Sequence, residues 1–108
     1  MEKQNINISK AILAATATDS KDAERVWRML DELERLLETA GGRSVGRVLQ
    51  LRSSPDSATY LGSGKLAELR SLCAANEVGL VVFDSELTPS QIRNIEEALG
   101  GNVDVIDR

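Results

Sequence analysis

Residues 80–97, Leu80-Val-Val-Phe-Asp-Ser-Glu-Leu-Thr-Pro-Ser-Gln-Ile-Arg-Asn-Ile-Glu-Glu97, show the clearest change from strand to helix in this sequence. The opening residues of this stretch form an apolar run of strand length, which ends at Asp84. Thr88 is then placed to cap a helix, Pro89 occupies the first helical position, and Gln91 completes a capping box. A buried strand therefore passes through a short polar turn into a helix, which is the repeating unit of an open α/β sheet.

The same change of hydrophobic period continues on both sides of this stretch. It predicts alternating strands and helices, beginning and ending with a strand, at residues 10–18, 21–40, 44–52, 63–75, 78–83, 88–99 and 103–106. Because crossover connections are right-handed, most or all of the strands should be parallel. We therefore predict an α/β fold with a single small open sheet of four mostly parallel strands and three crossover helices. Partners of such a sheet meet the loops that follow the strands, here residues 18–20, 52–62 and 84–88.

Composition excludes several kinds of site. The 108 residues include no His and a single Cys, Cys73, which rules out His-dependent nucleophiles, an internal disulfide and a Cys-only metal site. The length fits one compact domain, which we place at residues 10–108 after a poorly ordered segment at residues 1–9. No apolar run approaches the roughly 18 residues that span a bilayer, and the N-terminus lacks a secretion pattern, so we expect a cytoplasmic protein.

Two groups of residues are candidates for a nucleotide or metal site. Gly62-Ser-Gly-Lys65 lies where a long loop meets a helix, and helix N-terminal amides beside a lysine can hold an anion. A P-loop would need Gly in place of Thr59 and Ser or Thr in place of Leu66, so the phosphate-loop motif is not met. Asp84 and Glu86 offer carboxylates to Mg²⁺, although organising the turn into the capped helix is the favoured interpretation. We predict no catalytic residue and no metal site, and we keep a small nucleotide-binding domain as an alternative.

Basic residues are concentrated in the middle of the chain. The net charge of the whole sequence is −4, whereas residues 43–70 carry +3. Such a segment predicts a local patch that contacts phosphates, formed by Arg43, Arg47, Arg52, Lys65 and Arg70.

Three aromatic residues have different surroundings in the sequence. Trp27 and Phe83 fall on positions that face the core, so we expect both to be packing residues. Tyr60 lies in the long loop beside the glycines. It fits two roles equally well, stacking on a nucleic-acid base or covering the edge of the sheet.

Four stretches together resemble a known family. They are Val45-Gly-Arg-Val, Pro55-Asp-Ser-Ala-Thr-Tyr-Leu-Gly-Ser-Gly-Lys-Leu-Ala-Glu-Leu69, the stretch quoted first, and Val105-Ile-Asp-Arg108. In this order and spacing they resemble the N-terminal domain of the HflX-type ribosome-associated GTPases. In that family a helical hairpin and a GTP-binding domain follow, and the motifs of the latter do not occur in these 108 residues.

The resemblance implies a module that helps a GTPase engage the large ribosomal subunit and its RNA and dissociate stalled or idle ribosomes. It implies no enzymatic activity for this fragment, no cofactor bound to it, and GTP and Mg²⁺ for the parent protein. An alternative partner is the GTPase domain of its own chain, which the fragment would regulate, and we expect the fragment to be monomeric. The resemblance carries over a glycine-rich loop with Tyr60, Gly62, Gly64 and Lys65, and a capped-helix motif with Thr88, Pro89, Gln91, Arg93 and Asn94.

Overall fold

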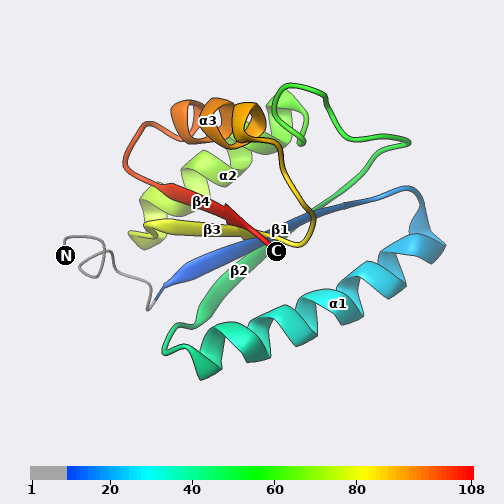
Figure 1. Ribbon diagram of the computed structural model, residues 1–108, viewed down its shortest axis with the longest axis horizontal. Helices are drawn as coiled ribbons and strands as arrows, with labels where there is room; N and C mark the ends of the chain where they lie inside the picture. The colour runs from blue at the N-terminus through cyan, green and yellow to red at the C-terminus, as the bar shows by residue number, and fades with distance from the viewer. Residues whose placement is uncertain (1–9) are drawn as a thin grey trace.

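The structure is a computed structural model that describes residues 10–108, so the segment predicted to be poorly ordered, residues 1–9, lies outside the described residues. The elements occur in the predicted order, and each boundary lies within two residues of the expected position (Figure 1). They are β1 (Ala11–Ala17), α1 (Ser20–Thr39), β2 (Ser44–Leu51), α2 (Ser63–Asn76), β3 (Leu80–Phe83), α3 (Pro89–Ala98) and β4 (Asp104–Asp107).

The strands form one four-stranded sheet in the order β2-β1-β3-β4. β1 pairs with β2 on one side and with β3 on the other, β3 pairs with β4, and all three pairings are parallel. The predicted α/β class with crossover helices is thus confirmed. The chain passes from β1 outward to β2 and then crosses back over β1 to β3, so the topology switches between β1 and β3.

The two faces of the sheet are covered unequally. α1 lies along one face, and α2 and α3 cover the other (Figure 1). Alternate residues of β1 supply both cores, because successive side chains of a strand point to opposite faces. Ile12 and Ala14 belong to the core under α2 and α3, whereas Leu13 and Ala15 belong to the core under α1.

The helix ends are fixed by local hydrogen bonds. Asp19 caps α1, because its side chain accepts a hydrogen bond from the backbone N–H of Asp22 at 2.8 Å. Gly41 follows α1 with a φ of 97°, a left-handed conformation that favours glycine. The predicted capping box of α3 is also confirmed. The Thr88 hydroxyl accepts from the Gln91 N–H at 3.1 Å, and the Gln91 side chain accepts from the Thr88 N–H at 3.0 Å.

The prediction for one aromatic residue is wrong. Phe83 is fully buried as expected, but Trp27 is 45% exposed. The reason is that α1 lies over β1 and β2, close to the margin of the sheet, so one border of its apolar stripe projects past the outer strand. The Trp27 ring instead packs against Arg47 of β2, whose guanidinium carbon lies 4.8 Å from the ring centroid.

None of the helices within residues 10–108 combines the length and the apolar character needed to cross a membrane.

Candidate functional site

The loop between β2 and α2, residues 52–62, is built around a closed turn. The backbones of Asp56 and Tyr60 exchange hydrogen bonds in both directions, at 3.0 and 2.9 Å. Inside the turn the Asp56 carboxylate accepts from the N–H groups of Ala58 at 2.8 Å and Thr59 at 3.0 Å. These donors hold the pKa of Asp56 below its usual value, because they stabilise the ionised carboxylate. The 52–62 loop is therefore ordered by its own sequence at its tip.

Helix α3 fastens this loop from the side. Gln91 Nε2 donates to the carbonyl oxygens of Asp56 at 3.2 Å and Ser57 at 3.3 Å, and Asn94 Nδ2 donates to the carbonyl of Ala58 at 3.0 Å. Gln91 thus completes the capping box with its side-chain oxygen and holds the loop with its side-chain nitrogen. We call the 52–62 loop together with residues 88–94 the loop–helix unit. It joins two motifs that lie more than thirty residues apart in the sequence.

Tyr60 anchors the loop–helix unit to the core. Its side chain is buried, and its ring packs edge-on against Phe83 with centroids 5.7 Å apart. The Tyr60 hydroxyl accepts a hydrogen bond from the Thr16 hydroxyl at 3.4 Å. Its φ of 66° is left-handed, which costs a non-glycine residue free energy and is maintained here by the packing of the ring. Of the two roles open to Tyr60 in the sequence, the structure supports covering the sheet and leaves no free ring face for a base.

The Gly62–Lys65 stretch opens α2, as expected. A Cβ at Gly62 would lie 2.7 Å from Arg52 Nη1, so a larger residue here would displace the flexible end of the Arg52 side chain. The Gly62 N–H already donates to Gln50 Oε1 at 2.8 Å, and Lys65 pairs with Glu68 at 3.1 Å. A Cβ at Gly64 would meet open space. One amide and the lysine of this stretch therefore already have partners within the domain.

The basic residues of the middle segment do not gather into one patch. Arg47 lies under α1, where its guanidinium pairs with Asp31 at 2.7 Å and Glu34 at 2.8 Å, and its side chain is only 14% exposed. Burial lowers the pKa of Arg47, but these two carboxylates outweigh it and leave the pKa raised. Lys65 and Arg70 belong to α2 on the opposite face, and Arg52 donates from Nε to the carbonyl of Ser54 at 3.0 Å.

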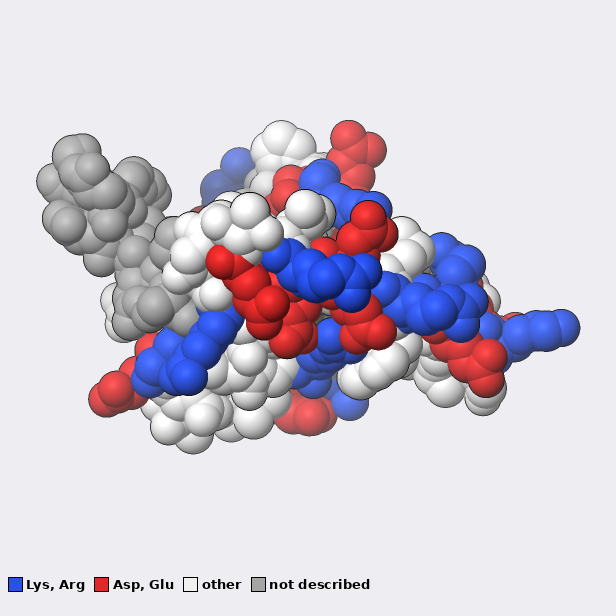
Figure 2. Space-filling model, turned by 90° about the horizontal axis from the view of Figure 1, so that it is seen from below, with Lys and Arg blue, Asp and Glu red and all other residues white. Residues whose placement is uncertain are grey.

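The face that carries α1 has no continuous basic surface. Acidic and basic side chains are interleaved across it (Figure 2). Arg43 is an exposed residue between α1 and β2. Contact between RNA and Arg43, Arg47, Arg52 and Lys65 therefore stays a prediction. In this structure these residues do not form a continuous basic patch.

The acidic residues after β3 have structural partners. Asp84 is buried, and its carboxylate accepts from Arg108 Nη1 at 2.6 Å. Glu86 is exposed, whereas Asp107 of β4 accepts from the Leu87 N–H at 2.7 Å and so fixes the turn into α3. No cluster of three metal-type ligands occurs within residues 10–108. The roles of Asp107 and Arg108 were not foreseen, because they depend on which strand lies beside β3.

Comparisons with known proteins identify the family. A family model described as "GTP-binding GTPase N-terminal" matches residues 28–108, which is most of the chain. A protein named GTPase HflX from Flavobacterium psychrophilum is 39% identical over 108 residues, and one of the same name from Caldanaerobacter subterraneus is 37% identical over 108 residues; both cover 100% of this chain. The chain belongs to the HflX GTPase family. The resemblance seen in the sequence is thereby confirmed.

The chain spans about a quarter of the length of its HflX relatives, namely 26% and 24% of the two proteins just named. It corresponds to their N-terminal part. A crystal structure of a variant of SsGBP is also similar, with a TM-score of 0.62 at 21% identity over 90% of this chain and 28% of that one. At this level of identity the likeness concerns the fold alone. What the comparisons show of function is that the chain belongs to a family of GTP-binding GTPases.

Asn94→Ala should loosen the loop–helix unit without unfolding the domain. The substitution removes the hydrogen bond to the Ala58 carbonyl, and we expect a loss of about 1 kcal/mol in the free energy of local opening of the loop. Amide hydrogen exchange should become faster in residues 56–61 and stay unchanged in β1. Arg93→Ala is the matched control, since Arg93 is an exposed neighbour on the same helix. Equal exchange in the two variants would contradict the role assigned to Asn94.

The turn of the 52–62 loop should weaken in acid. The folded-state pKa of Asp56 is below its unfolded value, so its contribution to stability is complete above the unfolded pKa, which is about 4. That contribution is lost as the pH falls through the lower, folded-state pKa. Amide exchange and carboxyl chemical shifts of the loop followed from neutral pH downward should show this transition. In Asp56→Asn the transition should vanish, and its persistence there would assign it to another carboxylate.

Proposed function

We propose that this chain is the ribosome-engaging and regulatory N-terminal domain of an HflX-type GTPase, which dissociates stalled or idle ribosomes through the large subunit. The observation that carries the proposal is the loop–helix unit, in which the two family motifs meet. A loop that is hydrogen-bonded at its tip, anchored by Tyr60 and held by Gln91 and Asn94 can meet a partner without a large loss of conformational entropy. Its exposed residues are Ser53, Ser54, Pro55, Ser57 and Ala58.

Chemistry on GTP belongs, in this proposal, to residues outside the chain. The Gly62–Lys65 stretch has its lysine paired with Glu68, and Asp84 is paired with Arg108. These two ion pairs support a structural role for Lys65 and Asp84, in keeping with a GTP site elsewhere in the full-length protein. The domain acts from the cytoplasm on RNA phosphates near the loop–helix unit, with Lys65 and Arg93 as exposed or half-exposed cations of that region.

Ribosome binding is tested by charge reversal on the loop–helix side. In a full-length HflX-type protein that carries this domain, Lys65→Glu combined with Arg93→Glu should weaken pelleting with large ribosomal subunits by roughly tenfold or more and reduce the salt dependence. The matched control is Lys21→Glu combined with Arg35→Glu, the same charge change on exposed residues of α1. Arg47 is unsuitable as a probe, because its loss leaves Asp31 and Glu34 unpaired. Equal binding by both double variants would remove the loop–helix unit from the interface.

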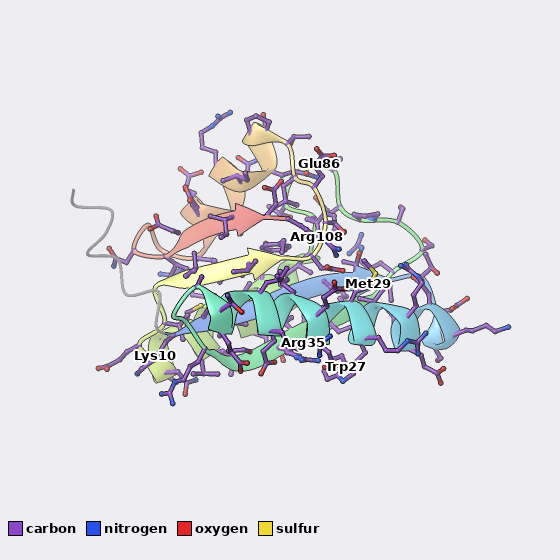
Figure 3. All side chains as sticks on the ribbon, turned by 60° about the horizontal axis from the view of Figure 1, so that its bottom comes forward. Lys10, Trp27, Met29, Arg35, Glu86 and Arg108 are labelled. Atoms are coloured by element: carbon purple, nitrogen blue, oxygen red, sulfur yellow. The ribbon has the colours of Figure 1, made fainter. Side chains whose placement is uncertain are left out.

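A second function, docking on the rest of the full-length protein, is favoured by an exposed apolar strip. The strip consists of Leu36 of α1, which is 61% exposed, and Ile106 of β4, which is 47% exposed. It lies on the same face of the sheet as α1, beside the strands β1 and β2 that α1 covers. Figure 3 shows Met29 on the side of α1 that faces Arg108 at the end of β4. Relatives about four times as long as this chain have ample further sequence to cover the strip.

The docking function predicts a change in GTP turnover. Leu36→Glu combined with Ile106→Glu in the full-length protein should shift turnover toward that of the same protein without residues 1–108. Each replaced leucine or isoleucine is already exposed in the isolated domain, so its folding should be preserved. Ser71→Glu, an exposed change on α2, should leave turnover unaltered. A double variant with unchanged turnover would refute docking through this strip.

A further inference from the structure

We propose that the outer edge of β2 is a self-association surface, through which two copies of this chain join their sheets across a two-fold axis. The first observation is the strand order. β2 is the outermost strand on its side and, at eight residues, the longest of the sheet. β4, the strand at the other margin, has four residues, and short edge strands resist further pairing.

Along β2, alternate residues direct their backbone N–H and C=O groups toward β1 and toward the outer edge of the sheet. The Arg52 N–H donates to the Ala17 carbonyl of β1 at 2.8 Å. In a parallel ladder the residues that face one neighbour alternate with those that face the other. The N–H and C=O groups of Arg47, Leu49 and Leu51 therefore point away from β1. Antiparallel pairing about Leu49 sets Leu49 against Leu49 of the second copy and Arg47 against Leu51 of the second copy, each a hydrogen-bonded pair.

This edge lacks the usual protection against pairing. β2 contains no Pro and no Lys, and its register shift lies at the opposite end, beside Ala11 and Ile12. The Arg47 side chain is folded against Asp31 and Glu34, so its charge does not guard the edge. The Leu51 side chain on this edge strand is 54% exposed.

The side of α1 that borders this edge carries a small apolar patch flanked by one acidic and one basic side chain. A shallow hollow next to Leu49 is lined by Ala23 and Trp27, with Glu24 and Arg28 at its rim. Trp27 points to the β2 side of α1, away from Met29 (Figure 3). Because Leu49 lies level with the turn between Glu24 and Arg28, a two-fold axis at Leu49 brings Glu24 of each copy opposite Arg28 of the other. Neither side chain has an ion-pair partner among the described residues.

The spacing of the elements allows this contact. Strands in a sheet lie about 4.8 Å apart, and α1 packs over β1 and β2. Continuing the sheet through β2 therefore places the two α1 axes about 10 Å apart, which is an ordinary packing distance for helices. Both Trp27 side chains would be covered by the partner helix. In this proposal the fragment forms a dimer, in place of the monomer expected from the sequence.

Sedimentation velocity of the 108-residue chain over a range of concentrations tests the proposal. The unaltered chain should associate to a dimer, and the emission of its single tryptophan should shift to the blue as concentration rises. Leu51→Lys should weaken the dimer by roughly tenfold or more, since the axis repeats the change in both copies. Leu36→Lys is the matched control, because Leu36 is an equally exposed leucine on the opposite side of α1, and it should leave the dimer intact.

Charge reversal identifies the register. Glu24→Arg alone and Arg28→Glu alone should each weaken the dimer, and the two substitutions together should restore it, because the pairing is then inverted in both copies. Circular dichroism of every variant separates a lost contact from a lost fold. The proposal is overturned if the unaltered chain stays monomeric at every concentration, if Leu36→Lys acts as strongly as Leu51→Lys, or if the double reversal fails to restore what the single reversals remove.

Discussion

The burial of β1 on both faces is the constraint on which the rest of the structure depends. Every residue of β1 except Thr16 is buried. Because no water reaches such a strand, its N–H and C=O groups must find partners on both edges, and β2 and β3 provide them. Its side chains are mostly alanine, which lets the helices on either side approach closely. The two cores of the molecule therefore meet at β1, and each is defined by alternate residues of that strand.

From this centre the crossovers carry the loop–helix unit to the carboxyl edge of the sheet. β2 and β3 lie on opposite sides of β1, so α2 must pass across the sheet between them. That path brings the 52–62 loop beside α3, where Gln91 and Asn94 reach its carbonyl groups. A single amide side chain, that of Gln91, links the local stability of a helix end to the shape of a loop far away in the sequence. Helix capping and loop order are thus coupled in this domain.

The unequal covering of the two faces gives the molecule its free surfaces. With α2 and α3 on one face and α1 alone on the other, the face under α1 is covered only over β1 and β2. Trp27 and Leu36 are separated by two and a half helical turns, so they lie on opposite borders of α1. Trp27 is beside the edge of β2, and Leu36 is on the side toward β4. The two proposed contacts of the domain each depend on the exposed apolar residues of one of these borders. These borders are left uncovered because one helix, α1, faces four strands.

The elements, their order and the capping box of α3 follow from the sequence alone, because they depend on interactions within one or two turns of the chain. The parallel class of the sheet follows as well, because alternating strands and helices are joined by crossover connections. The sequence also carried the family, since the motifs of residues 45–108 are continuous. Only the tertiary structure decided the strand order, the exposure of Trp27, the burial of Tyr60 and the pairing of Arg47 with Asp31 and Glu34. Hydrophobic period marks which side of a helix is apolar but not where the sheet beneath it ends. The net charge of a segment likewise does not reveal which of its Arg and Lys side chains will pair with carboxylates of a preceding helix. Both depend on contacts between residues distant in sequence, which exist only once the strands have taken their places.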